Sequence, residues 1–431
     1  MRLKALFTVT ISLLASNYAL SQKFDQQMFD LLLRGQHVEL PSKSIKDKNI
    51  ASKRADVWKK WKKAVITHYG LQLDESLLSS SKEYSWQLVD EDPLPFVFVK
   101  KDERPTNGYP LFINLHGSGP KSQEWSASKQ LSKGYKGGPS LYFVPQIPSE
   151  KRYRWGLIPM QQAYEKLLRL AMVSDQIDRN KMYVMGISEG GYGSQRLGAF
   201  YADYWAGVGP MAGGEPLENA PVLNFRNTAF AMETGEFDTG FGRDNYTQQA
   251  KMAFKEMKEN FPADFEHRVN FQAGRGHTIN YNLVSPWLIE QVRKPIPHHV
   301  SWVNFPLYGR YRQGFYNLAV EEPFGVHPDS TVDRTSFDVR IKAERNEVEL
   351  IAYAIDRGTD DTLPLKSGKL AIYLSEKQVN LNKPVRLCVN GKEVFNGVVK
   401  LDEVNIWRSC LLFGDPDRLF PAKLLVDFSK F

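Results

Sequence analysis

The sequence is poor in cysteine and, after its first residues, in long apolar runs. Its two thiols, Cys388 and Cys410, could pair in an oxidising compartment, but two thiols alone cannot supply a structural zinc site. His298 and His299 are adjacent, point apart on regular structure and have no evident third ligand, so we expect no metal site. No apolar run beyond the N-terminus is long enough to span a bilayer, and no internal repeat is apparent.

A strong excess of one charge is also absent. The net charge of +7 is spread over 431 residues, which is weak support for nucleic-acid binding. The densest basic cluster, at positions 59–63, alternates with Trp58 and Trp61 at helical spacing, as expected for the solvated face of an amphipathic helix. We therefore expect no nucleic-acid partner.

The N-terminus has the pattern of a secretory leader. Arg2 and Lys4 precede an apolar run over residues 5–15, and small residues follow around Ala19 and Ser21. This pattern predicts cleavage after Ser21, a secreted or periplasmic protein and no stable membrane insertion. An uncleaved anchor is the alternative, but the run is short for crossing a membrane.

The remaining chain is long enough for two or three domains, and 42% hydrophobic with 24% charged residues is ordinary for a globular protein. We predict an α/β fold with a mainly parallel sheet covered by helices on both faces at residues 83–296, because strands and helices alternate there. A helical N-terminal extension is predicted at 22–82 and a β-sandwich at 297–431.

The expected elements follow from hydrophobic periodicity and from turn residues. The predicted strands of the α/β part are 84–89, 94–99, 111–115, 141–144, 182–185, 228–232 and 269–271. The predicted helices are 55–69, a helix beginning near Pro159, one around 250–261, and 286–292 with Ser285 as N-cap. The predicted C-terminal strands are 337–341, 348–354, 369–374, 385–389 and 394–399, with a tight hairpin turn at Asn390-Gly391.

A candidate nucleophile lies directly after the strand at 182–185. Residues 186–190 read Gly-Ile-Ser-Glu-Gly, which fits the G-x-S-x-G turn that presents a serine hydroxyl between a strand and a helix. The flanking glycines allow close backbone packing around Ser188. A glycine-rich turn without catalytic function is the alternative, since the motif alone is common.

A serine nucleophile requires a base and usually a carboxylate that orients the base. His277 follows the strand at 269–271 in a glycine-rich loop, and Asp238 follows the strand at 228–232. The order Ser, Asp, His is that of α/β-hydrolases, so we predict Ser188, Asp238 and His277 as a triad. Glu236 and Asp244 are the competing carboxylates.

An oxyanion hole is predicted at the end of the strand at 111–115. Residues 116–119 read His-Gly-Ser-Gly, and such a loop would bring the N–H of Ser118 beside the N–H of Glu189. Because these are main-chain groups of a serine hydrolase, the predicted chemistry requires neither a cofactor nor a metal.

These motifs together resemble the α/β-hydrolase superfamily, over residues 95–295, and specifically its polyhydroxybutyrate-depolymerase-like and feruloyl-esterase-like branch, whose members are often labelled predicted peptidases. The resemblance implies an exported carboxylic-ester hydrolase with the triad above. It also implies, through the C-terminal β-domain of some relatives, a link to polysaccharide breakdown. Glu189 departs from the pattern, because relatives commonly carry Met or another uncharged residue there. An anion would oppose the developing oxyanion charge unless it is paired, so either the side chain points away or the substrate is unusual.

Four further residues are candidates for substrate binding, since their loops should border the Ser188 edge: Trp125, Arg154, Trp155 and Tyr192. Aromatic rings could stack on a sugar or aryl group and an arginine could hold a carboxylate, with core packing or a surface ion pair as the alternative. We thus predict a serine esterase acting on carbohydrate or related esters. A serine peptidase of the same fold and a catalytically silent carbohydrate-binding protein remain the alternatives.

Overall fold

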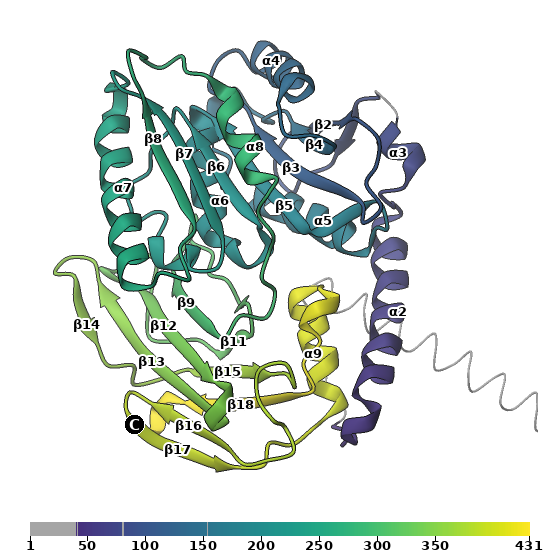
Figure 1. The fold of residues 1–431 in the computed structure, drawn as a ribbon, viewed down its shortest axis with the longest axis vertical. Helices are drawn as coiled ribbons and strands as arrows, with labels where there is room; N and C mark the ends of the chain where they lie inside the picture. Colours follow the sequence, from purple (N-terminus) through teal and green to yellow (C-terminus); the bar gives the residue numbers. More distant parts are fainter. Residues whose placement is uncertain (1–39, 41, 80–81, 153) are drawn as a thin grey trace, which may run out of the picture.

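A computed structural model describes residues 40, 42–79, 82–152 and 154–431. The predicted leader, with its cleavage after Ser21, and the beginning of the predicted N-terminal extension lie outside these residues. The described chain forms one large sheet from residues 84–272 and two further sheets from residues 299–427 (Figure 1).

The large sheet has eight strands in the order β1-β2-β4-β3-β5-β6-β7-β8. They are β1 (Tyr84–Trp86), β2 (Leu94–Lys101), β3 (Tyr109–Leu115), β4 (Ser140–Pro145), β5 (Ile177–Ile187), β6 (Gly207–Met211), β7 (Ala229–Gly235) and β8 (His267–Gln272). The β1–β2 and β2–β4 pairs are antiparallel, and every pair from β4 onward is parallel. The predicted fold class, α/β with a mainly parallel sheet, is confirmed.

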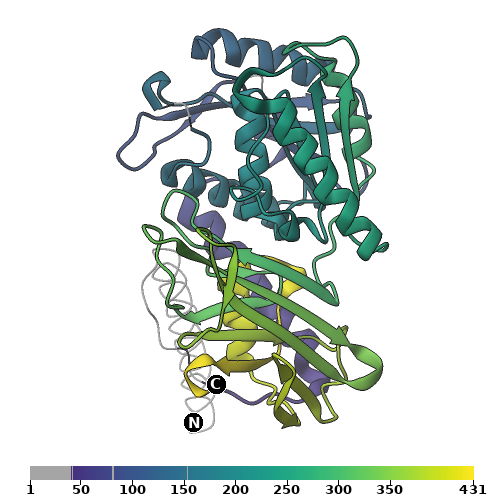
Figure 2. The same ribbon diagram turned by 90° about the vertical axis from the view of Figure 1, so that its left-hand side faces the viewer.

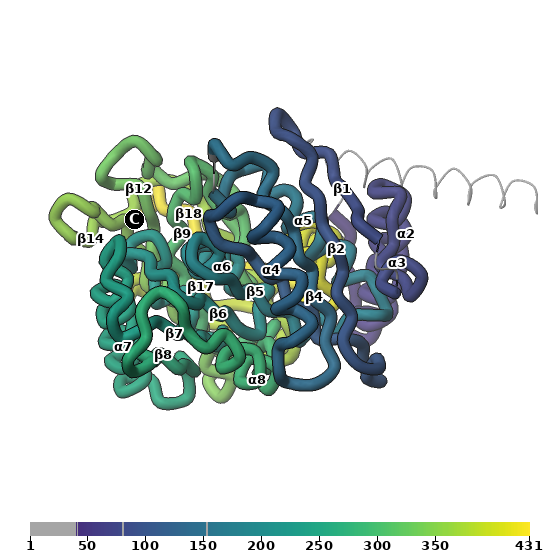
Figure 3. The backbone as a smooth tube through the Cα atoms, turned by 90° about the horizontal axis from the view of Figure 1, so that it is seen from above, coloured from purple at the N-terminus to yellow at the C-terminus, as the bar shows by residue number. Residues whose placement is uncertain are grey.

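Helices cover both faces of this sheet. They are α4 (Lys121–Gly134), α5 (Ile158–Val173), α6 (Glu189–Phe200), α7 (Arg243–Asn260) and α8 (Val284–Leu288). Figure 3 shows α6 and α8 on opposite sides of the central strands. Alternate residues of β3 explain why both faces need cover: Leu111 and Ile113 pack in one hydrophobic cluster, and Phe112 packs in another with Leu288 of α8. A strand that is apolar on both sides belongs at the centre of such a sheet.

The predicted helix near Pro159 is confirmed as α5, with that proline in its first turn. The prediction for α8 is wrong in its bounds and in its cap. The helix begins at Val284 after Leu283, and Ser285 lies inside it, where its hydroxyl donates to the Lys136 carbonyl at 2.9 Å. A tertiary contact has therefore replaced the expected local capping bond.

Strand β6 was not predicted from the sequence, because Gly-Val-Gly-Pro-Met lacks the bulky residues typical of a buried strand. Its small residues admit α8: a Cβ at Gly207 would lie 2.7 Å from Leu288 Cδ2, and one at Gly209 would lie 2.5 Å from Val284 Cγ1. The close approach of α8 thus requires glycine where periodicity alone would require valine or isoleucine.

The C-terminal part contains a six-stranded sheet, a four-stranded sheet and one helix (Figure 2). Its elements are β9 (His299–Asn304), β10 (Gly314–Phe315), β11 (Leu318–Glu322), β12 (Val332–Lys342), β13 (Glu347–Asp356), β14 (Asp361–Leu363), β15 (Lys369–Leu374), β16 (Val385–Val389), β17 (Lys392–Gly397), α9 (Glu403–Phe413) and β18 (Ala422–Asp427). The sheet orders are β17-β16-β13-β12-β9, with β14 paired to β13, and β10-β11-β15-β18.

All five predicted C-terminal strands are present, whereas the sequence did not predict β9, β10, β11, β14, β18 and α9. Asn390 and Gly391 have φ values of 47° and 81°, as the predicted tight hairpin turn requires. Cys388 and Cys410 are both buried and free, so no disulfide joins them. The predicted domain boundary at 296/297 falls between β8 and β9, and the division into domains itself stays a prediction.

The N-terminal extension contains α2 (Ile50–Tyr69) and α3 (Glu75–Ser79), and α2 ends at Gly70 with φ of 57°, as the sequence indicates. Helix α2 runs along both parts of the molecule and contacts α5 and α9 (Figure 1). Its Trp61 side chain is fully buried in the main core. Among the helices of the described residues, none is long and apolar enough to cross a membrane.

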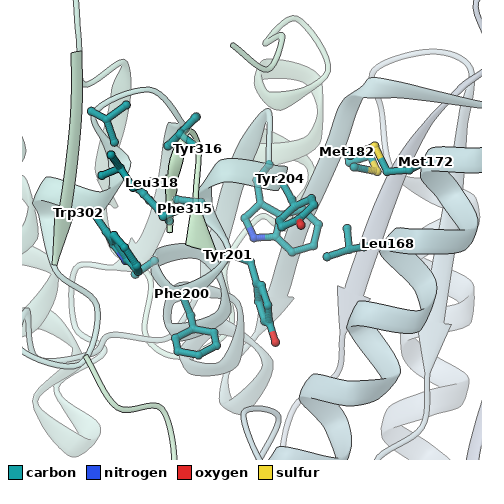
Figure 4. Packing of buried hydrophobic residues seen from close by; sticks show 14 of the residues in the cluster. Leu168, Met172, Met182, Phe200, Tyr201, Tyr204, Trp302, Phe315, Tyr316 and Leu318 are labelled. Atoms are coloured by element: carbon teal, nitrogen blue, oxygen red, sulfur yellow. The ribbon is translucent and has the colours of Figure 1, made fainter. Parts of the chain in front are cut away.

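The hydrophobic core continues from the large sheet into the C-terminal strands. Figure 4 shows Phe200 and Tyr201, at the end of α6, between Leu168 of α5 and the C-terminal residues Trp302 and Phe315. All five side chains belong to one buried cluster. The C-terminal part is therefore packed onto the large sheet through shared apolar surface.

Candidate active site

The predicted nucleophile lies in a strained turn between β5 and α6. Ser188 has φ of 55° and ψ of −116°, a conformation that is costly for a residue with a side chain, and its N–H donates to Met211 O at 2.9 Å. The flanking glycines are required sterically: a Cβ at Gly186 would lie 2.3 Å from Gly190 O, and one at Gly190 would lie 2.0 Å from Leu115 O. The turn therefore has the geometry that the G-x-S-x-G motif predicts.

The structure brings Ser188, His277 and Asp238 together at the carboxyl edge of the sheet. Ser188 Oγ lies 3.0 Å from His277 Nε2, and His277 Nδ1 lies 2.8 Å from Asp238 Oδ2. A carboxylate only accepts hydrogen bonds, so Nδ1 carries the proton and Nε2 accepts from the serine hydroxyl. This arrangement can remove a proton from Ser188 as its oxygen attacks an electrophile.

The two competing carboxylates have other partners. Glu236 Oε2 accepts from the N–H of Gly274 at 2.8 Å and so anchors the loop that carries His277. Asp244 lies in the first turn of α7, and its N–H donates to Asp238 O at 3.2 Å. Both acids support the site through backbone contacts, and Asp238 is the acid that contacts the imidazole.

Arg243 holds the second oxygen of Asp238, and sequence reasoning did not single it out. Its Nη1 donates to Asp238 Oδ1 at 2.8 Å. The Asp238 side chain is only 3% exposed, and the guanidinium compensates the cost of burying its negative charge. No motif marks Arg243, because the pair depends on how the loop after β7 enters α7.

The predicted oxyanion loop is fixed by the buried side chain of His116. The N–H of Ile147 donates to His116 Nε2 at 3.0 Å, so Nδ1 carries the proton and donates to Gly117 O at 2.8 Å. Burial lowers the pKa of His116 to about 4, although the bond to Gly117 opposes that shift. The neutral ring thus attaches the loop to the chain that follows β4.

A pocket of about 510 Å³ opens in front of the nucleophile. Its walls are made by Ser118, Arg154, Ser188, Glu189, Tyr192, Arg196, Gly214, Glu215, Pro216, Asn219, Phe241, Arg243 and Tyr246. Both residues predicted to supply oxyanion donors are therefore beside Ser188. Glu189 begins α6, and the first N–H groups of a helix have no acceptor within the helix.

The Glu189 carboxylate, which the sequence places beside the predicted oxyanion hole, is paired with an arginine. Its Oε1 lies 3.5 Å from Arg154 Nη1. Burial raises the pKa of Glu189, and the nearby charges of Arg154 and Arg196 oppose the shift. Pairing with Arg154 reduces the negative potential that this side chain would otherwise place near the predicted oxyanion position.

Two of the four predicted substrate-binding residues, Arg154 and Tyr192, line the pocket. The predictions for Trp125 and Trp155 are wrong, because both side chains are buried in the core, at 6% and 1% exposure. Each uses its indole N–H internally: Trp125 donates to Val144 O at 3.0 Å, and Trp155 donates to His116 O at 3.1 Å. Trp155 thereby holds the first residue of the oxyanion loop from within the core.

Phe241 is a second residue that sequence reasoning missed. It lines the pocket, is 86% exposed and has φ of 57°, an uncommon conformation for an aromatic residue. Arg196 and Glu215 were also missed. They form an ion pair of 2.6 Å in the pocket wall, and Glu215 belongs to the segment after β6, the strand that the sequence did not indicate.

Within the part of the chain that the structure describes, no group of three or more His, Cys, Asp or Glu side chains is arranged to hold a metal ion. His299, one of the adjacent histidines, instead has Nε2 2.9 Å from Asp338 Oδ2. That pair belongs to the junction of β9 and β12.

The chain is similar to solved structures of other proteins. No protein-family model and no curated protein matches the sequence. A thermostable esterase aligns with 18% identity and a TM-score of 0.36 over 51% of this chain, which spans 64% of that esterase. Esterase 2 of Thermogutta terrifontis, in a form phosphorylated by paraoxon, aligns with 12% identity and a TM-score of 0.38 over 51% of this chain and 94% of its own. The BES protein of Bacillus cereus aligns with 13% identity and a TM-score of 0.34 over 48% of this chain and 92% of its own.

Proposed function

We propose that the protein is a serine hydrolase that cleaves carboxylic esters. The observation that carries this proposal is the continuous contact from Ser188 Oγ to His277 Nε2 at 3.0 Å and from His277 Nδ1 to Asp238 Oδ2 at 2.8 Å. His277 would accept the Ser188 proton during attack on the ester carbonyl and return it to the departing alcohol. A water activated by the same imidazole would then release the acyl group.

The N–H groups of Ser118 and Glu189 would stabilise the tetrahedral oxyanion. Both residues line the pocket beside Ser188, and the N-terminus of α6 directs its positive dipole end toward the same position. The engagement of Glu189 by Arg154 makes the acidic side chain compatible with this role.

We further propose that the protein is exported and acts on acyl esters of carbohydrates. The N-terminal leader pattern supports export, and the resemblance to feruloyl-esterase-like hydrolases supports the substrate class. Exposed aromatic and charged groups at the pocket, notably Phe241 and Arg154, suit a polar substrate that carries an aromatic or sugar unit.

Hydrolysis of p-nitrophenyl acetate and methyl ferulate by the purified protein and its Ser188→Ala variant tests this proposal. We expect kcat to fall by about 10⁴-fold or more in the variant, since removal of the nucleophile disables the triad as a unit. Ser194→Ala is the matched control: this serine lies on α6, and its hydroxyl donates to Gly191 O at 2.9 Å. The control should keep activity within a few-fold, roughly as for the loss of one modest hydrogen bond.

Two outcomes would favour the alternatives. Cleavage of acetyl-p-nitroanilide at a rate comparable to p-nitrophenyl acetate would favour a serine peptidase. Oligosaccharide binding without turnover of any ester, unchanged by Ser188→Ala, would favour a silent carbohydrate-binding protein.

A further inference from the structure

A second cavity, of about 430 Å³, lies beside the catalytic pocket and shares Arg154, Arg196 and Asn219 with it. The C-terminal part contributes much of its remaining wall, including Tyr308 and Arg357. We call it the Tyr308 cavity. Because three residues line both spaces, the Tyr308 cavity adjoins the catalytic pocket.

Tyr308 is held in an unfavourable backbone conformation at the tip of a two-residue turn. Leu307 and Arg310 exchange backbone hydrogen bonds of 3.0 and 3.2 Å, and Tyr308 and Gly309 between them have φ values of 52° and 82°. Such a turn prefers Asn-Gly, and a tyrosine at its first position costs conformational energy. The unusual backbone conformation of Tyr308 lies beside a cavity, which favours a functional role for its ring.

The Tyr308 side chain connects the C-terminal part to the catalytic pocket. Its hydroxyl accepts from Arg196 Nη1 at 3.0 Å, and Arg196 Nη2 lies 2.6 Å from Glu215 Oε1 in the catalytic pocket. The ring lies against Gly156, where an added Cβ would be 2.9 Å from Tyr308 Cε2. One arginine therefore joins the walls of both spaces.

Acidic and basic side chains contact one another in the wall of the Tyr308 cavity. Asp333 is buried and accepts from Arg334 at 2.8 Å, and its other oxygen lies 2.9 Å from Arg357 Nε. Arg334 also donates to Glu218 O at 2.7 Å. Donors and acceptors side by side, next to an aromatic face, match the vicinal hydroxyls and the apolar ring face of a sugar.

We propose that the Tyr308 cavity is a binding subsite for a sugar unit on the alcohol side of the ester, remote from the bond that is cleaved. This inference rests on the proposed ester hydrolysis and adds a role for the C-terminal part in substrate selection. Tyr308 supplies the stacking surface, and Arg357 supplies hydrogen-bond donors at the far wall.

The test compares kcat/KM for acetylated xylo-, manno- and cellotetraose with kcat/KM for p-nitrophenyl acetate, which carries no sugar unit. For each tetrasaccharide, the ratio is its kcat/KM divided by kcat/KM for p-nitrophenyl acetate. In Tyr308→Asn and Arg357→Ala, this ratio should fall by about tenfold for at least one tetrasaccharide, as expected for the loss of one stacking or charged hydrogen-bond contact. Tyr308→Asn creates the preferred Asn-Gly turn, so the variant should fold with an unfolding midpoint close to that of the wild type.

Arg408→Ala is the matched control, because Arg408 also belongs to the C-terminal part, is 41% exposed against 36% for Arg357, and likewise has a glutamate at 3.8 Å. It should leave the ratio unchanged. Ratios equal to the wild-type value in both cavity variants, for all three tetrasaccharides, would overturn the subsite. Failure of the proposed function would be distinct, since p-nitrophenyl acetate would then show no hydrolysis that depends on Ser188.

Discussion

Two aspartate–arginine systems lie at opposite edges of the large sheet, and they differ in what the aspartate does. At the carboxyl edge, Asp238 follows β7 and divides its oxygens between Arg243 and His277. At the amino edge, Asp203 precedes β6 and pairs with Arg418 at 2.6 Å. Both acids are buried, but the His277 side chain on Asp238 is 46% exposed, so the proposed catalytic system reaches solvent through its imidazole.

The amino-edge system is closed to solvent. Arg418 donates to Asp203 and also to Asp415 Oδ2 at 2.7 Å, and Arg293 donates to the same Asp415 oxygen at 2.7 Å. All four side chains are fully buried. Burial alone opposes ionisation of Asp415, yet Arg293 and Arg418 hold the pKa of its carboxyl well below the usual range.

Similar ion pairs thus acquire different roles at the two edges. The buried network joins Asp203 and Arg293, from the large-sheet part, to Asp415 and Arg418, from the C-terminal part. At the catalytic edge, one carboxylate oxygen is left to the exposed imidazole of His277. Both sites contain a buried aspartate–arginine pair. The proposed site of proton transfer differs from the buried network because the second partner of Asp238, His277, is exposed to solvent.

The largest effect is expected from Asp238→Asn. The amide can no longer fix the His277 tautomer, so kcat for p-nitrophenyl acetate should fall by about 10⁴-fold. The free energy of unfolding should fall less than it would for a lost side chain, because asparagine keeps the volume of aspartate and can still accept from Arg243, although the buried guanidinium loses its counter-charge. A loss of stability without a loss of kcat would contradict the division of roles drawn above.

Arg418→Met should show the opposite pattern. It leaves Asp203 and Asp415 without their shared cation and should lower the free energy of unfolding by about 3 to 5 kcal/mol, as for a broken buried ion pair. Activity per folded molecule should stay near that of the wild type, since the network is at the far edge of the sheet.

Arg179→Met is the matched control for that experiment. Arg179 lies 3.2 Å from Asp417, beside the network, but is 44% exposed. An exposed pair contributes about 1 kcal/mol or less, so this variant should be close to the wild type in urea unfolding. Equal losses in the two arginine variants would mean that burial does not distinguish these pairs.

The sequence was sufficient for the residues that follow strand ends. Ser188, Asp238 and His277 could be predicted because each follows an apolar segment, and parallel strands deliver their carboxyl ends to one edge. The same reasoning could not separate Trp155, which lies under the oxyanion loop, from Arg154, which lines the pocket, although the two are adjacent in sequence.

What the sequence did not reveal depends on contacts between distant segments. The pairing of Arg418 with Asp203 spans 215 residues, and no local pattern marks either partner. Strand β6 was missed because the packing of α8 requires glycine at positions 207 and 209. Tyr308 contacts Arg196 in the wall of the catalytic pocket through the placement of the C-terminal part, which periodicity does not encode.

His116 differs from both systems, since it lies at the catalytic edge, is as buried as the network and is neutral. Burial lowers its pKa to about 4, against about 6.5 in an unfolded chain, and the bond to Gly117 only partly offsets the shift. The unfolded state therefore binds more protons between these values, and stability should be lost as the pH falls from 6.5 toward 4. Between pH 7 and pH 5 the loss from this group is about 2 kcal/mol.

Urea unfolding of the wild type and of His116→Gln at both pH values measures this contribution. Glutamine can accept the N–H of Ile147 and does not titrate, so the variant should lose about 2 kcal/mol less than the wild type over that interval. Identical pH dependence in the two proteins would mean that the folded state tolerates a protonated ring. The oxyanion loop would then be held by Trp155 and by its own backbone. Its attachment would not depend on a neutral His116 ring.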